Sequence, residues 1–231
     1  MHPASEVVLD GPEGHHAAQV RRVRVGETVD LVDGAGTRAC CAVTAVERGR
    51  VLLRVDGRSH EPPSALRVVV VQALAKGDRG ERAVELMTEV GVDEVVPWAA
   101  SRSVVQWQGE RGERAVTRWR STARESSKQS RRSWFTEIGP VLQTRDVAAR
   151  LQAADLSIVL TGDATGTLSG IPVPSQGEVL LVVGPEGDLT EQELAVFDAA
   201  GAVRASLGPT VLRTSTAGAV AAAVVLSRAR W

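Results

Sequence analysis

Two loops rich in glycine and proline each follow an apolar run in the C-terminal third of the chain. Residues 179–187 read VLLVVGPEG, and residues 205–213 read ASLGPTVLR. An apolar run of this length predicts a buried strand, and glycine in the loop that follows lets a ligand approach backbone N–H and C=O groups. Ligands of open α/β sheets bind at the carboxyl ends of the strands, so the two loops together predict a binding site.

The common nucleotide-binding motifs do not account for these loops. The chain has no GxGxxG pattern, and neither loop carries the Lys-Ser/Thr ending of a phosphate-binding P-loop. For either loop alone, an ordinary turn between a strand and a helix is the alternative interpretation. Thr190 and Glu193 stand at capping-box spacing, which predicts that a helix begins directly after the first loop.

The elements that would position these loops fall into two parts. Short runs that each end in a turn cover residues 20–26, 27–36, 39–49 and 50–58, and they predict a small antiparallel β-barrel. A proline-containing stretch at residues 59–66 predicts a linker. Beyond it, apolar runs and helical patterns alternate, which predicts a parallel sheet with both faces covered. We expect strands within residues 66–74, 93–98, 155–162, 178–184 and 203–208, and a helix within 81–91.

Composition limits the partners of the chain. Its 231 residues are 43% apolar, enough for a sizeable core, and its formal net charge is −1. However, eight basic and two acidic residues lie between Arg111 and Arg132, a local excess of six positive charges. This segment is either a solvated face of a helix or a surface that contacts phosphates. Trp107, Trp119 and Trp134 lie in or near it, as core anchors or as platforms for stacking bases.

Several function classes are not expected. Cys40 and Cys41 are the only cysteines, and as chain neighbours they make a poor disulfide pair and fit no zinc-binding spacing. The first thirty residues lack the pattern of a secretory signal, and no uninterrupted apolar stretch reaches about 18 residues, the minimum for a membrane span. We therefore expect a cytoplasmic protein with no bound metal and no membrane segment.

Four stretches of the chain carry a family resemblance. They are VVGPEGDLTEQEL followed by LGPTVLRTSTA, TEVGVDEVVPWAASRS at 88–103, SKQSRR at 127–132, and HAAQVRRVRVGETVDLVDGAG at 16–36. In their order along the chain, these stretches resemble the RsmE-type 16S ribosomal RNA uracil-N3 methyltransferases of the SPOUT class, over nearly the whole chain. The resemblance implies a PUA-like, RNA-binding β-barrel over residues 1–65. It also implies an α/β SPOUT methyltransferase domain over residues 66–231 with a C-terminal trefoil knot.

The resemblance further implies a cofactor, a substrate and an assembly. The cofactor is S-adenosylmethionine, held in loops after three strands, with Leu207 and Leu212 against the adenine. The substrate is 16S ribosomal RNA in the small subunit, and the active form is a homodimer. The cofactor contacts carried over are Leu160, Thr161, Gly162, Gly184, Pro185, Glu186, Gly187, Leu207, Gly208, Leu212, Thr216 and Ala217. The RNA contacts carried over are His16, Arg22, Arg124, Gln129, Arg131 and Arg132.

Arg213 is the candidate catalytic residue. Uracil N3–H is a weakly acidic imide, so methylation needs an unpaired base and loss of the proton. Arg213 follows the second loop directly, where it would stabilise the developing uracil anion or hold the target phosphate. Alternatively it is a structural arginine bound to loop carbonyls.

The chain departs from the family pattern next to this arginine. Ser215 stands where the family commonly has glutamate. A carboxylate role at that position cannot be carried over, and Glu186 is the nearest other acid. We assign no general base from the sequence. This departure keeps open an alternative, a catalytically idle SPOUT-like assembly factor that binds ribosomal RNA. A nucleotide-binding oxidoreductase is a second alternative, which the missing GxGxxG pattern disfavours.

Overall fold

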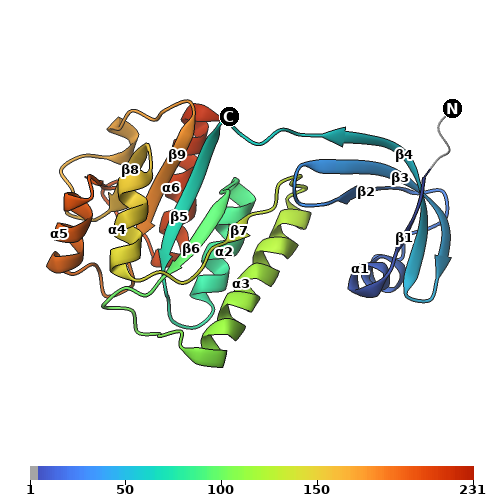
Figure 1. Ribbon diagram of the computed structural model, residues 1–231, viewed down its shortest axis with the longest axis horizontal. Coiled ribbons are helices and arrows are strands. Elements are labelled where there is room, and N and C mark those ends of the chain that lie inside the picture. The colour runs from blue at the N-terminus through green and yellow to red at the C-terminus, as the bar shows by residue number, and fades with distance from the viewer. Residues whose placement is uncertain (1–4) are drawn as a thin grey trace. The chain divides into compact units, whose positions relative to one another are not determined.

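The computed structural model describes residues 5–231, which divide into two compact units between Pro63 and Ser64 (Figure 1). The division falls at the proline-containing stretch, close to the boundary expected at residue 65. The first unit is built on an antiparallel sheet and the second on a parallel sheet. The change of pattern along the sequence therefore marks a change of architecture.

The first unit is a four-stranded antiparallel sheet with a short helical segment packed against it. Its strands pair in the order β1-β4-β3-β2, so β1 and β2 form the two edges of the sheet. Buried side chains at alternate positions, such as Cys41 and Val43 on β3, form its core together with the helical Ala17 and Ala18. The elements are β1 (Glu6–Leu9), α1 (Gly11–His15), the π-helix η1 (His16–Val20), β2 (Thr28–Val32), β3 (Thr37–Glu47) and β4 (Arg50–His60).

The strand expected over residues 20–26 is wrong. The π-helix ends at Val20, and Arg22 has a φ of 55°, a left-handed conformation that an extended strand does not contain. The amide of Val23 instead donates to the carbonyl of Ala17 at 3.1 Å, which buries Val23 in the core. Val20 and Val25 remain 63% and 65% exposed, so the alternation of this run does not reflect a half-buried strand.

The second unit is a parallel sheet of six strands in the order β10-β8-β9-β5-β6-β7. The expected parallel sheet is therefore confirmed, as are the strands and the helix expected within its sequence ranges. The elements are β5 (Leu66–Ala73), α2 (Arg79–Val90), β6 (Glu94–Trp98), α3 (Gly109–Gln129), β7 (Glu137–Ile138), α4 (Thr144–Ala153), β8 (Leu156–Leu160), the short 3-10 helix η2 (Leu168–Gly170), β9 (Gly177–Val183), α5 (Glu191–Ala199), β10 (Val203–Ala205) and α6 (Thr214–Ala229).

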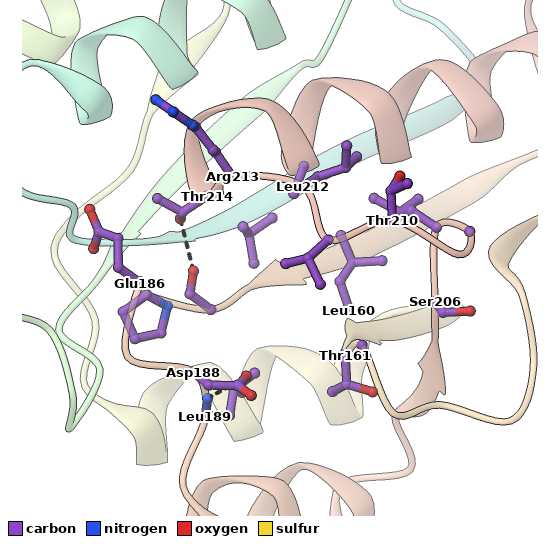
Figure 2. A pocket seen from close by; sticks show the side chains of 18 of the residues that line it. Leu160, Thr161, Glu186, Asp188, Leu189, Ser206, Thr210, Leu212, Arg213 and Thr214 are labelled. Atoms are coloured by element: carbon purple, nitrogen blue, oxygen red, sulfur yellow. Dashed lines mark hydrogen bonds between the residues drawn. The ribbon is translucent and has the colours of Figure 1, made fainter.

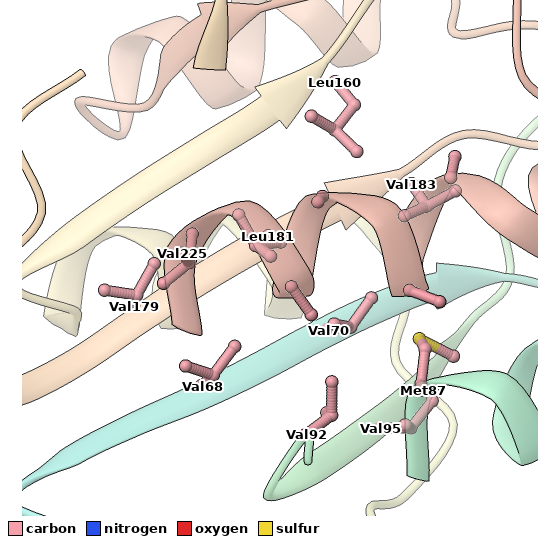
Figure 3. Close-up of a cluster of buried hydrophobic side chains, with 14 of the residues drawn as sticks. Val68, Val70, Met87, Val92, Val95, Leu160, Val179, Leu181, Val183 and Val225 are labelled. Carbon is pink, nitrogen blue, oxygen red and sulfur yellow. The ribbon is translucent and has the colours of Figure 1, made fainter. Parts of the chain in front are cut away.

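Both faces of this sheet are buried, which explains the continuous apolar runs. On β5, Val68 and Val70 belong to a core with α2, α3 and α6, whereas Val69 and Val71 belong to a core with α4 and α5. Figure 3 shows the first of these cores, with α6 lying over β5 and β9. A strand covered on both sides has no solvent face on which a polar residue would be favoured.

The small residues of α6 allow it to lie close to its neighbours. A Cβ atom added at Gly218 would lie 2.7 Å from Met87 Sδ and 3.3 Å from Val70 Cγ1. The first of these distances is shorter than carbon and sulfur atoms tolerate, so any larger side chain would force α2 or β5 away from α6. The interpretation that these small residues permit close backbone packing is therefore confirmed within the chain.

We predict that Gly218→Val destabilises the second unit by about 1–3 kcal/mol, because the added side chain overpacks the contact of α6 with α2 and β5. Urea unfolding followed by tryptophan fluorescence measures this, since all five tryptophans lie after Ser64. Gly166→Ala is the matched control, because a Cβ at Gly166 meets no atom within 4 Å. Equal unfolding midpoints for the two variants would contradict the packing account.

Candidate active site

A pocket of about 600 Å³ lies at the carboxyl edge of the parallel sheet (Figure 2). Its walls come from the ends of β8, β9 and β10, the loops that follow these strands, and the first turns of α6. Both glycine-proline loops line this one cavity, although Gly184 and Gly208 are well separated in the chain. The prediction that they form a single site is therefore confirmed in its geometry.

Most of the expected cofactor residues line the pocket. They are Leu160, Thr161, Gly162, Gly184, Pro185, Glu186, Leu207, Gly208, Leu212 and Ala217, and Arg213 joins them. Gly187 and Thr216 do not line it. Gly187 packs against Arg102, whose Cβ would lie 3.1 Å from a Cβ at that glycine. The hydroxyl of Thr216 donates to the carbonyl of Arg213 at 3.1 Å within α6.

Sequence reasoning missed one loop of the pocket. Arg79 lines the cavity from the segment Lys76-Gly77-Asp78-Arg79, which follows β5. The rule that identified the other loops, a glycine-containing turn after an apolar strand, applies to this segment as well. Asp188, Ser206, Thr210 and Val211 also line the pocket, inside or beside the two loops already identified.

A chain of two hydrogen bonds joins the ends of two strands, β5 and β9, to the start of α6. Gln72, wholly buried at the end of β5, donates from Nε2 to Thr214 Oγ1 at 2.9 Å. The Thr214 hydroxyl donates in turn to the carbonyl of Gly184 at 2.8 Å (Figure 2). Because a buried amide without a partner is strongly unfavourable, this link holds the first turn of α6 against the end of β9.

The first loop ends in the predicted capping box. The amide of Glu193 donates to Thr190 Oγ1 at 3.1 Å, and the amide of Thr190 donates to Glu193 Oε2 at 2.9 Å. Glu193 is almost fully buried and also accepts from the amide of Ser101 at 2.8 Å. The capping carboxylate therefore connects the first loop to the segment after β6 as well as starting α5.

Glu186 forms an ion pair at the rim of the pocket. Its Oε1 accepts from Arg79 Nη1 at 2.9 Å and from the amide of Lys76 at 3.3 Å. Burial raises the pKa of Glu186, but hydrogen bonds from its own amide, Arg79 and Lys76 outweigh burial, so that the pKa lies below its usual value. This carboxylate is therefore charged near neutral pH and is a weak proton acceptor.

Charged and apolar groups occupy different parts of the pocket. Arg213 is exposed at the start of α6, and in Figure 2 it lies on the same side as Glu186. The apolar part of the pocket is formed by Leu160, Leu207 and Leu212. These side chains belong to or pack against the core on the α6 side of the sheet. Ser215, which departs from the family pattern, is buried in α6 and does not line the cavity.

Comparisons with known proteins identify the family. A family model for an RNA methyltransferase domain matches residues 62–226, and one for an RNA methyltransferase PUA domain matches residues 9–56. The ribosomal RNA small subunit methyltransferase E of Mycobacterium tuberculosis is 44% identical over 97% of this chain and 87% of its own length. The chain belongs to the ribosomal RNA small subunit methyltransferase E family. The Bacillus subtilis member is 29% identical over 90% of this chain and 85% of its own length.

Solved structures of similar proteins share the fold of this chain. The Neisseria gonorrhoeae methyltransferase E, solved with S-adenosylmethionine, matches with a TM-score of 0.87 at 25% identity, over 99% of this chain and 94% of that one. A Legionella pneumophila methyltransferase solved with S-adenosylmethionine gives a TM-score of 0.89 at 25% identity, with the same coverage of both chains. The resemblance stated from the motifs and the mixed α/β fold with an antiparallel PUA module are therefore confirmed.

The basic segment of this family member forms α3 and the turn after it. Gln129 ends α3, and Arg131 after it is exposed with a φ of 55°. Arg124 is also exposed and lies over the ring of Phe135, with its guanidinium carbon 5.6 Å from the ring centre. In the first unit, His16 and Arg22 are both exposed. These five side chains remain candidates for RNA contact.

Arg132 has a different environment. Its Nε donates to the carbonyl of Trp134 at 2.8 Å, and its Nη1 donates to the carbonyl of Thr88 at 2.9 Å. The guanidinium thus ties the turn after α3 to the last turn of α2. Trp119 is likewise a core residue, 1% exposed and packed edge-to-face on Trp107 with ring centres 4.9 Å apart. These contacts favour structural roles for Arg132 and Trp119.

The part of the chain that the structure describes contains no group of three or more histidine, cysteine or acidic side chains placed to hold a metal ion. None of the helices in residues 5–231 is long and apolar enough to cross a membrane.

We predict that in Glu193→Gln the free energy of unfolding falls less with decreasing pH than it does in the wild-type protein. Burial raises the pKa of Glu193, but hydrogen bonds from Ser101 and Thr190 outweigh it and lower the pKa below its ordinary 4.5. A lowered pKa means that the carboxylate stabilises the fold above pH 4.5, and that this contribution is lost as pH falls through the lowered value. Urea unfolding at several pH values should show wild type and variant converging below pH 4.5. A difference between them that does not change with pH would contradict the assignment.

We predict that Arg132→Ala destabilises the second unit by about 1–3 kcal/mol, because it removes the hydrogen bonds that the guanidinium donates to the carbonyls of Thr88 and Trp134. Arg120→Ala on α3 is the matched control, since Arg120 is exposed, and we expect a change of at most about 0.5 kcal/mol. Both values come from urea unfolding. If the two variants are equally stable, Arg132 is available for RNA and the structural role is wrong.

Proposed function

We propose that this protein transfers the methyl group of S-adenosylmethionine to N3 of a specific uridine of 16S ribosomal RNA, in the decoding region of the assembled small subunit. The observation that carries the proposal is the single pocket lined by both glycine-proline loops. Family membership supports the reaction class, and S-adenosylmethionine is bound in the related structures from Neisseria and Legionella.

The residues of the pocket fit this cofactor. A cavity of about 600 Å³ lies within the usual range for cofactor sites. Leu160, Leu207 and Leu212 offer apolar contact to an adenine ring, and the glycine-proline loops offer backbone groups. The charged groups of the lining are Glu186 and Asp188 against Arg79 and Arg213, so its formal charges balance. When bound, S-adenosylmethionine supplies an electrophilic methyl group on a sulfonium.

Arg213 is the residue that we assign to charge stabilisation. The target uracil reaches the pocket unpaired, because N3 is occupied in a base pair. A guanidinium beside O2 or O4 of the base stabilises the negative charge that develops as the imide proton leaves. Glu186 does not serve as the base, since its lowered pKa and its ion pair with Arg79 make it a weak proton acceptor. The imide proton passes to solvent.

RNA binding is assigned to both units. The exposed arginines of α3 and the following turn provide positive charge, and release of counterions from RNA makes such binding depend on salt. The first unit matches a family model for an RNA methyltransferase PUA domain, which supports contacts from His16 and Arg22. We do not include Arg132 among the RNA contacts, because its guanidinium donates hydrogen bonds to the carbonyls of Trp134 and Thr88.

Three further expectations complete the proposal. We infer a homodimer, supported by exposed apolar side chains on and beside α6, namely Val211, Val220 and Trp231. The trefoil knot implied by the family resemblance stays a prediction. The cytoplasmic location, where small subunits are assembled, also stays a prediction.

The idle assembly factor is the less favoured function. It was raised by Ser215, but that side chain is buried within α6 and lines no part of the pocket. Ser215 therefore presents no group to the cavity of this chain. We retain transfer of a methyl group as the function.

We predict that Arg213→Ala lowers kcat about 100-fold on small subunits from a strain that lacks the modification, because the developing anion loses its cation. Transfer of radiolabelled methyl groups gives the rate, and mass spectrometry of 16S RNA fragments locates the product. Arg145→Ala is the control, since this exposed arginine lies on α4, on the opposite face of the sheet from α6. Wild-type turnover by Arg213→Ala would remove its catalytic role, and absence of N3-methyluridine with the wild-type protein would remove the proposed function.

A further inference from the structure

The first glycine-proline loop forms one wall of the pocket. On its side away from the cavity, this loop is hydrogen-bonded to another loop. Residues 99–108 connect β6 to α3, and Arg102 lies within them. Arg102 Nη1 donates to the carbonyl of Gly187 at 3.1 Å and to the carbonyl of Leu189 at 3.3 Å. The neighbouring amide of Ser101 donates to Glu193 Oε1 at 2.8 Å. Two consecutive residues of the β6–α3 loop therefore hold both ends of the turn that leads into α5.

The two loops approach so closely at Gly187 that an added Cβ would require Arg102 or the turn to shift by a few tenths of an ångström. A Cβ at Gly187 would lie 3.1 Å from Arg102 Cβ and 3.3 Å from the Arg102 carbonyl oxygen. The next residue, Asp188, has a φ of 64°, which is unfavourable for a residue with a side chain. Its amide donates to the carbonyl of Pro185 at 3.0 Å. The turn therefore combines its own hydrogen bond with those that Arg102 donates from the neighbouring loop.

Arg102 does not itself line the pocket, whereas Glu186, Asp188 and Leu189 do. The carbonyls that Arg102 binds belong to the same short turn as these lining groups. A substitution of Arg102 therefore alters the shape of the cavity only if it moves this turn. Because most of the wall is backbone, the position of the turn sets how well the cavity fits its ligand.

We infer that Arg102 is a positioning residue for the cofactor: from outside the pocket it holds the turn Gly184–Leu189 in the shape that binds S-adenosylmethionine. The inference rests on the proposed function. It differs from the alternative that an exposed arginine near an active site contacts RNA. A positioning role affects affinity for the cofactor, whereas an RNA contact affects affinity for the small subunit.

Arg102→Ala tests the inference. We expect the Kd for S-adenosylhomocysteine, measured by calorimetry, to rise about tenfold, which corresponds to about 1.4 kcal/mol and to the loss of the hydrogen bonds from a charged donor. The KM for S-adenosylmethionine should rise in parallel, with kcat at saturating cofactor and the KM for small subunits nearly unchanged. Arg102→Lys keeps one charged donor and should recover affinity to within about threefold of wild type.

Two further variants separate positioning from general destabilisation. Gly187→Ala keeps the guanidinium but pushes the turn away from Arg102, so it should also weaken binding of S-adenosylhomocysteine, even if Arg102→Ala fails to fold. Arg82→Ala is the control, because this exposed arginine pairs with Glu85 within α2. Its affinity should equal that of wild type.

The outcomes distinguish this inference from the proposed function. If the wild-type protein does not bind S-adenosylhomocysteine, the proposed function is lost and the inference with it. If wild type binds and Arg102→Ala binds equally well, the positioning role alone is overturned. Unchanged cofactor affinity together with a raised KM for small subunits would assign Arg102 to the RNA instead.

Discussion

The hydrogen bonds that run from Gln72 through Thr214 to Gly184 fix the arrangement on which the site depends. Gln72 ends β5 with its side chain wholly buried, so its amide needs a partner inside the protein. Thr214 supplies that partner and passes the bond on to the carbonyl that ends β9. As a result, the loop before α6 and the loop after β9 meet at the same edge of the sheet.

Close packing of α6 supports the same arrangement. Gly218 allows the helix to lie against α2 and β5, with Met87 and Val70 in direct contact. A helix so placed can reach Gln72 with its first turn, only one turn away from Gly218. The small residues of α6 and the hydrogen bonds at its start therefore act together to fix the position of this helix on the sheet. Packing at Gly218 sets the distance of α6 from α2 and β5. The hydrogen bonds of Thr214 set the rotation of α6 about its axis and its position along the strands.

Electrostatics divide the pocket by role. The carboxylate of Glu186 is held charged by Arg79 and by backbone donors, which makes it a poor base. Arg213 brings positive charge to the same side, next to where a reacting base would enter. Arg102 acts from outside the cavity through carbonyls of the turn. Arg79 and Arg102 thus contact the same short turn from two sides, Arg79 through the Glu186 carboxylate and Arg102 through backbone carbonyls.

The sequence by itself determined the parallel sheet, the capping box at Thr190 and Glu193, and the loops that would form the site. These features depend on local patterns: continuous apolar runs, a glycine-proline turn after a strand, and a Thr-x-x-Glu spacing. Local pattern failed over residues 20–26, where the left-handed Arg22 ends any strand. Only the tertiary structure decided that Arg132 binds carbonyls of α2, that Gly187 faces Arg102 rather than the cavity, and that Arg79 joins the site. The partners in these contacts are far apart in the chain, so no spacing within the sequence could reveal which groups would meet.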